Sequence, residues 1–495
     1  MRFRASFACL LLLLAPAANA ATPDQATLAQ VDKIFADWRL SAHAPGLVYG
    51  VVADGRLVRV NGLGVQDVAT RRSVSSDSLF RIASMSKAFT ALAILKLRDE
   101  GRLSLDALAE TYVPEMKGWR YPTADSPRMT VRNLLTHSAG LVEDNPWGDR
   151  QQALPEAGFT AVLKAGVPFS RSPGLAMEYS NFGYATLGRI VGNVSGMPYQ
   201  DYIRRQIMAP LGMNSSGFDV FASPQARRAL GYRWQDNRWV REPDMADGTF
   251  GAMGGIETNA DDYGKWVAFL LSAWPARNDA ENGPVRRSTV REIVTGANFA
   301  EGSNRSPAIG GAPCRWAQAY GMGWQVIDDC DLGRVVTHTG GYPGYGSVVL
   351  LLPDKNVGIF AFSSRTYGAP ALAAFRAAMT LNKAGVLQET AIALTPGLST
   401  AYAAARSVWA TGDIAAGPLA NNVLMDRDAA AWKKMIAGVK AEVGACDTSA
   451  PIMPSSAMEG RFTWTCAHGR VSGRVQRAPT PAVTIQALQF APAAP

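Results

Sequence analysis

The chain has 495 residues, of which 49 are Lys or Arg and 41 are Asp or Glu, giving a formal net charge of +8. Apolar residues make up 47% of it, so a globular protein of two or three domains with a real core is expected, not a disordered one. The positive charge is spread out and forms no Lys/Arg run, which excludes a recognisable nucleic-acid patch.

The first 20 residues have the pattern of an export signal. Arg2 and Arg4 precede an apolar run to Leu14, and Ala18-Asn19-Ala20 is a small-residue cleavage site. An uncleaved anchor is the alternative, but the run is shorter than the roughly 20 residues that span a bilayer, and no later segment is long and apolar enough. We therefore expect residues 1–20 to be removed and the mature protein to be periplasmic or secreted, without a transmembrane anchor.

Strand patterns at both ends of residues 21–385 enclose a helical region. The expected elements in chain order are a helix at 31–40, a hairpin over 47–60 turning at Asp54-Gly55, an apolar helix from Ser84 to Gly101, a mostly helical region over 105–300, strands at 335–337, 347–352 and 357–362, and a helix at 370–383. This order predicts an α+β fold, in which one antiparallel sheet is flanked by helices and accompanied by an all-α lobe. The cleft is expected between the two lobes.

A Thr395-Pro396-Gly397 break lies at the end of a linker expected over 386–397. Residues 398–495 then predict a small α+β domain, with helices near 400–410 and 428–443 and strands near 461–465, 470–475 and 482–488. One hypothesis makes this domain a recognition part that docks on cell wall or closes over the cleft.

Four cysteines remain after the signal, which contains Cys9. An even number in an exported protein favours two disulfides, and sequence order favours Cys314 with Cys330 and Cys446 with Cys466, one of three connectivities. Four free buried thiols are the alternative. No close Cys-x-x-Cys or His-rich cluster is present, so no metal site is expected.

Ser84 and Lys87 form the only Ser-x-x-Lys of the chain, at the start of its longest apolar helical stretch. Positions i and i+3 share a helix face, so the amine would lie beside the hydroxyl at the positive end of the helix. Such a serine can become a nucleophile, although a chain of this size should contain roughly one such spacing by chance.

Two further motifs follow in order: Tyr179-Ser180-Asn181, and His338-Thr339-Gly340-Gly341 at the start of strand-like sequence. With Ser84-x-x-Lys87, these resemble the penicillin-recognising serine hydrolases, in the branch of class C β-lactamases, DD-peptidases, D-aminopeptidases and related esterases. Similar segments include 135–141, 254–258, 320–324 and 340–344, and the resemblance covers about residues 28–385. It implies a β-lactamase/transpeptidase-like fold and no cofactor.

The resemblance also implies a role for each matching residue. Ser84 would be the acylated nucleophile with Lys87 within hydrogen-bonding reach, and Tyr179 would act as general base or relay the serine proton. Asn181 would hold Lys87 and the substrate amide. The N–H groups of Ser84 and Gly341 would form the oxyanion hole. The remaining strand residues, expected to bind substrate, are His338, Thr339 and Gly340.

Elementary chemistry adds two expectations. A free tyrosine has a pKa of about 10, and nearby cations favour the phenolate, so Lys87 and a charged His338 are expected to lower the Tyr179 pKa. Relatives that hydrolyse β-lactams usually have Lys where this chain has His338, and histidine is only partly charged near neutral pH. Weak β-lactam hydrolysis is therefore expected.

The sequence thus predicts an exported serine hydrolase that forms an acyl-enzyme on Ser84 and acts on peptide-like (D-amino-acid peptide or amide) or ester substrates, including small or cell-wall-derived ones. A true β-lactamase and a low-turnover penicillin-binding or sensing module are the alternatives. His137, in a Leu-Thr-His-Ser context, fits a structural turn, and Trp147 is either a wall of the cleft or buried packing.

Overall fold

The computed structural model describes residues 23–390 and 392–493, and these form two compact units that meet between Glu389 and Thr390. That boundary falls inside the segment expected to be a linker. The expected signal peptide, residues 1–20, lies outside the described residues.

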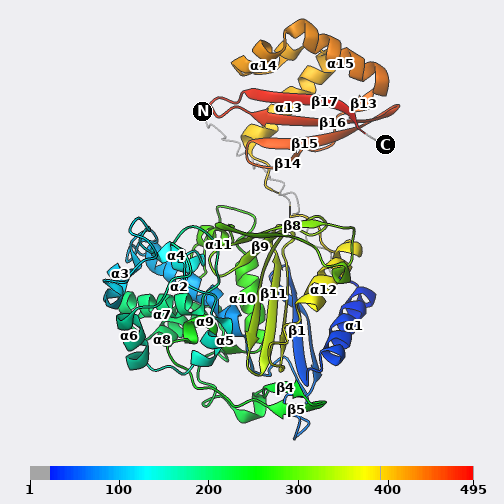
Figure 1. Ribbon diagram of the computed structural model, residues 1–495. Coiled ribbons are helices and arrows are strands. Elements are labelled where there is room, and N and C mark those ends of the chain that lie inside the picture. The colour runs from blue at the N-terminus through cyan, green and yellow to red at the C-terminus, as the bar shows by residue number, and fades with distance from the viewer. Residues whose placement is uncertain (1–22, 391, 494–495) are drawn as a thin grey trace, which may run out of the picture. The chain divides into compact units, whose positions relative to one another are not determined.

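The larger unit is built on an eight-stranded antiparallel sheet with strand order β2-β1-β12-β11-β10-β9-β8-β7 (Figure 1). In that order its strands are β2 Arg56–Gly64, β1 Gly46–Ala53, β12 Val357–Ser363, β11 Tyr345–Leu352, β10 Gly333–Tyr342, β9 Gln325–Asp329, β8 Arg315–Tyr320 and β7 Asn298–Asn304. Sequence analysis identified β1, β2 and β10 to β12. It missed β7, which is mostly exposed, and β8 and β9, whose residues are mostly only partly buried.

The sheet pairs strands from the two ends of the unit. β1 and β2 form the expected hairpin, in which Asp54 and Gly55 both have positive φ angles, of 48° and 71°. β1 then pairs with β12, so a strand from the start of the larger unit lies beside a strand from its end, inside the sheet. Every residue of β1 is buried, because helices cover both faces of the sheet there.

Helices α1 (Gln25–Ser41) and α12 (Ala371–Lys383) cover one face of the sheet. On that face, Leu47, Tyr49 and Val51 of β1 pack against apolar residues of both helices. The alternate residues Val48 and Val52 belong to the larger core on the other face, as the two-residue period of a strand requires.

The other face of the sheet carries the all-α lobe. Its helices are α2 Lys87–Asp99, α3 Ala109–Tyr112, α4 Val131–Leu135, α5 Asn145–Gly148, α6 Glu156–Ala165, α7 Asn181–Ser195, α8 Tyr199–Ile203, α9 Gly251–Gly254, α10 Ala260–Leu271 and α11 Arg287–Ile293. Two small ribbons lie beside it: β3 Phe80–Arg81 with β6 Glu257–Thr258, and β4 Tyr232–Gln235 with β5 Arg238–Arg241. This arrangement confirms the predicted fold class.

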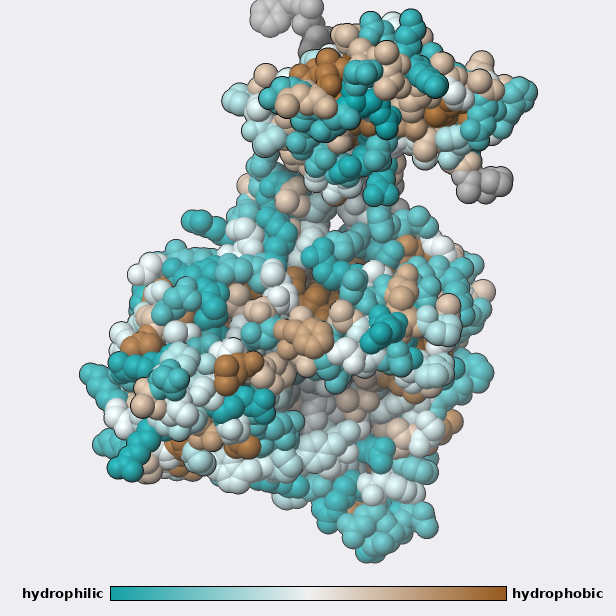
Figure 2. Space-filling model, turned by 45° about the horizontal axis from the view of Figure 1, so that its top comes forward, coloured by the Kyte–Doolittle hydropathy of each residue, from teal (hydrophilic) through white to brown (hydrophobic). Residues whose placement is uncertain are grey.

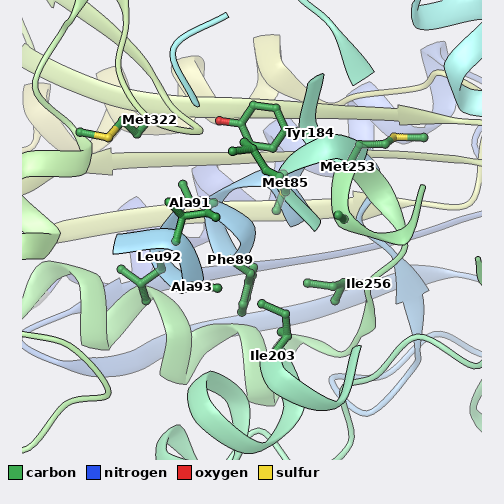
Figure 3. Packing of buried hydrophobic residues seen from close by; sticks show 14 of the residues in the cluster. Met85, Phe89, Ala91, Leu92, Ala93, Tyr184, Ile203, Met253, Ile256 and Met322 are labelled. Atoms are coloured by element: carbon green, nitrogen blue, oxygen red, sulfur yellow. The ribbon is translucent and has the colours of Figure 1, made fainter. Parts of the chain in front are cut away.

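Helix α2 runs through the centre of the larger core. Its residues from Lys87 to Leu95 are all buried, and Figure 3 shows Phe89, Ala91 and Leu92 among side chains of other elements, including Tyr184 and Met253 (Figure 3). A helix that is apolar on every side is stable only inside a protein. The start of α2 is therefore fixed rigidly, and it holds Lys87 directly after the buried turn that contains Ser84.

The smaller unit is an α+β domain with its own core, as predicted. Its elements are α13 Pro396–Thr411, α14 Asn421–Asp426, α15 Ala429–Val443, β13 Cys446–Asp447, β14 Met453–Pro454, β15 Glu459–Cys466, β16 Gly469–Arg477 and β17 Ile485–Ala493. Helices α13 and α15 pack on the sheet. Trp409 of α13 and Ile436 of α15 share a core with Trp464 of β15.

The two disulfides have the pairing predicted from sequence order, Cys314–Cys330 and Cys446–Cys466. The first joins the segment before β8 to the turn after β9, and the second joins β13 to the end of β15. The surface view in Figure 2 is mainly hydrophilic, with scattered apolar side chains (Figure 2). In the described part of the chain, no helix combines the length and the apolarity needed to cross a bilayer.

Candidate active site

Ser84 lies in a 3₁₀ turn, Ala83–Ser86, that leads directly into α2. The preceding Ala83 has a φ of 49°, a conformation that L-residues seldom adopt and that is common at functional turns. Strand β10 passes so close that a Cβ on Gly340 would come 2.3 Å from the Ile82 oxygen and 3.1 Å from the Ala83 Cβ. Only glycine fits there, so the turn and the strand edge are held in direct contact.

Lys87 points at Ser84 from the same side of the turn. Its Nζ lies 3.1 Å from Ser84 Oγ, 2.7 Å from Asn181 Oδ1 and 2.9 Å from the Met253 carbonyl oxygen. The side chain is fully buried, and no carboxylate in the described residues lies within ion-pair distance of it. Burial lowers the pKa of Lys87 to about 7, although the negative charges of Asp149 and Asp144 oppose that shift.

This geometry accommodates both forms of the lysine: the charged amine donates to all three oxygens, and the neutral amine can accept from the Ser84 hydroxyl instead. An uncharged amine has two N–H donors and one lone pair. In the neutral form, Asn181 Oδ1 and the Met253 carbonyl oxygen, which make the two shorter contacts, accept the two N–H groups. The lone pair then faces the Ser84 hydroxyl, so the amine can accept the serine proton.

Asn181, the first residue of α7, is fixed by two neighbours on the preceding loop. Asp144 accepts the main-chain N–H of Asn181 at 2.6 Å and that of Phe182 at 2.9 Å. The Asn181 side-chain amide donates to Asn145 Oδ1 at 3.0 Å, which leaves its oxygen for Lys87. A carboxylate at a helix N-terminus is stabilised by the exposed N–H groups there, so Asp144 acts as an anchor for this end of α7.

Tyr179 closes the other side of Ser84. Its hydroxyl hydrogen-bonds to the Ser84 side chain, and Lys87 Nζ lies 4.8 Å from the centre of its ring. The expectation of a lowered Tyr179 pKa is wrong for this free site. Burial raises the pKa well above 10, and the hydrogen bond to Ser84 opposes the shift only partly. Tyr179 is therefore protonated at neutral pH.

His338 is also uncharged, which corrects the expectation of a partly charged side chain. Its Nε2 lies 3.0 Å from the Tyr320 hydroxyl, and its Nδ1 lies 2.6 Å from the Thr339 carbonyl oxygen. Nδ1 must donate to that carbonyl, so Nε2 accepts from the tyrosine. Burial, together with the charge of Lys87, lowers the pKa of His338 to about 3.

His137 supports Tyr179 from behind. Its φ is 54° and its Nδ1 accepts the Ser180 N–H at 3.1 Å, which fits the structural turn expected from sequence. Its ring centre lies 4.3 Å from that of Tyr179. His137 thus fixes the tyrosine ring without reaching the cleft.

The second half of β10 forms one wall of the cleft. The ladder between β9 and β10 ends at the pair Gln325 and Thr337, so residues 338–341 extend past β9. Their other edge stays paired with β11, where Gly341 lies opposite Gly346. The main chain of these residues on the β9 side therefore adjoins the cleft.

A cleft of about 440 Å³ joins these parts. It is lined by Ser84, Asn145, Asp149, Met177, Tyr179, Gln325, His338, Thr339, Gly340, Gly341, Tyr367 and Ala369. Lys87 and Asn181 lie behind this lining. A larger hollow of about 770 Å³, formed mainly by residues 198–224, contains none of the predicted site residues.

Sequence reasoning missed five contributors described above: Asp144, Asn145, Asp149, Tyr367 and the Met253 carbonyl. The loop 143–149 contains four polar residues next to a proline and a glycine, which is a general sign of a functional loop. Tyr367 and Met253 have no local pattern that would identify them. Within the described residues no three His, Cys, Asp or Glu side chains are grouped so as to hold a metal ion.

Comparison with known proteins agrees with this architecture. The model of the Beta-lactamase family matches residues 25–382. Protein flp of Staphylococcus aureus (strain N315) is 29% identical over 339 residues, which are 68% of this chain and 62% of that protein. Penicillin-binding protein 4* of Bacillus subtilis (strain 168) is 26% identical over 326 residues, 63% of this chain and 66% of that protein. The chain thus matches less than two thirds of the length of these curated relatives.

Two solved structures share the fold. The octameric penicillin-binding protein homologue from Pyrococcus abyssi superposes with a TM-score of 0.61 and 21% identity, over 91% of this chain and 96% of that one. A class C β-lactamase superposes with a TM-score of 0.57 and 21% identity, over 73% of this chain and 99% of that one. Since the family match covers the whole larger unit from α1 to α12, the chain belongs to the Beta-lactamase family of serine hydrolases related to penicillin-binding proteins and class C β-lactamases.

Proposed function

We propose that this protein is an exported hydrolase that forms an acyl-enzyme on Ser84 and transfers the acyl group of peptide-like or ester substrates to water. The observation that supports this most directly is the contact of 3.1 Å between Ser84 Oγ and a buried lysine amine whose pKa is about 7. A base with a pKa near the working pH combines a usable neutral fraction with real proton affinity.

In the acylation step, neutral Lys87 takes the proton of the Ser84 hydroxyl while Oγ attacks the substrate carbonyl carbon. The N–H groups of Ser84 and Gly341 stabilise the negative oxygen that forms. The protonated Tyr179 gives its proton to the leaving alcohol or amine as the bond to the carbonyl carbon breaks. The acylated Ser84 oxygen no longer carries a proton, so the Tyr179 phenolate recovers its proton, by way of solvent, from the Lys87 ammonium, beside which its ring lies.

In deacylation, a water molecule attacks the ester carbon of the acyl-enzyme. The Lys87 amine accepts the proton of that water. The bond between Ser84 Oγ and the acyl carbon then breaks, and Oγ takes this proton from Lys87, which restores the free enzyme. No cofactor takes part in either step. Asn181, held by Asn145, keeps Lys87 aimed at Ser84 throughout.

Peptide-like and ester substrates fit this site better than β-lactams, because an uncharged His338 supplies no cation for the carboxylate of a β-lactam. We expect kcat/KM for nitrocefin below about 10⁴ M⁻¹s⁻¹, the low end of ordinary enzymes. The expectation of export rests on the sequence of residues 1–20 and is supported by the two disulfides, which persist in oxidising compartments.

The test is labelling with a fluorophosphonate probe, followed by peptide mass spectrometry. We expect one adduct on Ser84, and Ser84→Ala as the matched control should show none while it keeps the thermal transition of the wild type. Folded wild-type protein without an adduct on Ser84, and without turnover of p-nitrophenyl esters, would show that the proposal is wrong.

A further inference from the structure

Asp149 is the residue with a net negative charge in the lining of the cleft. Among the twelve residues that line it there is no Lys or Arg, and the His338 ring is neutral. Lys87 lies behind Ser84, and Arg150, the neighbour of Asp149, is exposed outside the lining. A substrate in this cleft therefore meets one carboxylate and no exposed cation.

The Asp149 side chain is buried without a cationic partner. The residue is 2% exposed, and in the described residues no Lys or Arg lies within ion-pair distance of its carboxylate. Burial raises its pKa to about 6, while Lys87 and Arg150 act on it only at longer range and Asp144 opposes them. A buried carboxylate without a cation is unfavourable by itself and is stabilised by any cation that enters the cleft.

Tyr367 connects this carboxylate to the strand edge. Its hydroxyl hydrogen-bonds to Asp149, and its Cδ1 would lie 2.9 Å from a Cβ on Gly341. The Tyr367 side chain therefore lies between Gly341 and the Asp149 carboxylate, with its ring next to the glycine and its hydroxyl next to the carboxylate. Tyr367 has a φ of 52°, which is unusual for a bulky residue, and two main-chain carbonyls, of Tyr342 and Tyr345, hold it there.

We propose that Asp149 is a specificity-determining residue that binds a primary ammonium group on the acyl part of the substrate, close to the scissile carbonyl. The cleft then prefers aminoacyl esters and amides to neutral acyl groups, and it disfavours acyl groups that bear a carboxylate. Tyr367 positions the carboxylate by its hydroxyl. This proposal rests on the proposed acyl-enzyme function of Ser84, because the ammonium is placed relative to the attacked carbonyl.

The preference can be measured with two kinds of p-nitrophenyl ester that have the same shape. The first is the alanyl ester, tested as each enantiomer, and the second is the isobutyryl ester, in which a methyl group replaces the ammonium. Spontaneous hydrolysis is subtracted, and the assay is at pH 7, where the amine is mostly charged. We expect wild-type kcat/KM to be at least about tenfold higher for one alanyl ester, as a charge-assisted hydrogen bond implies. Asp149→Asn should remove most of that ratio, because kcat/KM falls more for the alanyl ester than for the isobutyryl ester.

Asp54→Asn is the matched control, since it removes the same charge from the β1–β2 turn, where Asn also accepts a positive φ. Its ratio should equal that of the wild type. Tyr367→Phe removes only a hydroxyl from a half-exposed ring and should lower the ratio by a few-fold, which tests the proposal even if Asp149→Asn does not fold.

A wild-type ratio near one, or a ratio unchanged in Asp149→Asn, would overturn the proposal. An equal loss of kcat/KM for both esters in Asp149→Asn would also overturn it. Such a loss is expected if Asp149 acts only on the pKa of Lys87, because that effect is the same for every substrate. In each of these cases Ser84 is still labelled by fluorophosphonate, whereas failure of the proposed function removes both the label and all ester turnover.

Discussion

Two groups of buried charges in the larger unit have opposite properties. Near the disulfide Cys314–Cys330, Arg305 lies 3.0 Å from Asp329, and both side chains are at most 2% exposed. Trp316 and two main-chain N–H groups also donate to Asp329, so the pKa of this carboxyl is lowered in spite of burial. At the cleft, Lys87 and Asp149 are similarly buried, but no ion-pair partner in the described part of the chain compensates them, and their pKa values move toward neutrality.

Burial alone does not define a functional charge. Asp329 and Arg305 satisfy each other and are fixed in their charged forms. Lys87 and Asp149 lose solvation without gaining an oppositely charged partner among the described residues, and so they can exchange protons or bind a ligand near neutral pH. The same interior thus contains a structural ion pair and a reactive pair of separated charges.

The largest effect is expected from making the reactive cation permanent. Lys87→Arg places a guanidinium that stays protonated where the amine must lose its proton. We expect kcat/KM for p-nitrophenyl acetate to fall by about a thousandfold, within the range for loss of a general base. Steady-state hydrolysis assays measure kcat/KM, and circular dichroism shows whether the variant is folded. A loss below tenfold would exclude Lys87 as the base.

Breaking the structural pair should change stability and leave chemistry unchanged. Arg305→Met leaves Asp329 buried without its cation, and we expect it to lower the free energy of unfolding by about 3 kcal/mol or more at pH 7. The pKa of Asp329 is lowered in the folded state, so this difference is present above about pH 4 and narrows as pH falls through the folded pKa.

The matched control is Arg334→Met, which removes an ion pair with Asp354 whose side chains are both 45% exposed. We expect this change to lower the free energy of unfolding by less than about 1 kcal/mol. Urea unfolding of both variants gives the values. Equal losses would mean that burial does not distinguish the two pairs.

The pH dependence of the wild type tests the unpaired amine directly. Lys87 acts as a base only when neutral, and its folded pKa is about 7, so kcat/KM should rise with pH through 7 and level off above it. Between pH 5 and 7 the increase should be about fiftyfold, because kcat/KM rises about tenfold per pH unit well below the pKa and only half of the amine is neutral at the pKa itself. A profile that is flat from pH 5 to 8 contradicts a titrating base with this pKa.

The smallest effect is expected at the anchor of Asn181. Asp144→Asn offers one acceptor to two N–H groups, so the start of α7 should loosen and kcat should fall by about tenfold with little change in KM. Loss of a negative charge that raises the Lys87 pKa should also shift the midpoint of the pH profile downward. Glu143→Gln, an exposed neighbour, should change neither quantity.

Local sequence patterns predicted much of the fold because its central elements have strong local signals. The Asp54-Gly55 turn and the apolar runs of β11 and β12 define strands without any tertiary information. Strands β7 to β9 lack the continuous apolar runs of β11 and β12 and exist through pairing with each other and with β10, which local pattern does not encode.

The candidate site divides in the same way. Ser84, Lys87, Tyr179, Asn181 and residues 338–341 follow from motifs in chain order, and the structure brings them together around one cleft. The charge states could not be predicted, because they depend on how completely each group is desolvated. The sequence therefore led to the wrong direction for the Tyr179 pKa and to a partly charged His338.

The close approach of Gly340 to the nucleophile turn has a consequence for how this scaffold can vary. A side chain at position 340 would push the strand away from Ile82 and Ser347, so the gap between nucleophile and strand edge is set by two backbones in contact. The Asp149 side chain, on the opposite wall, takes no part in this contact. New substrate preferences can thus arise on that wall by single exchanges while the bond-breaking geometry stays constant.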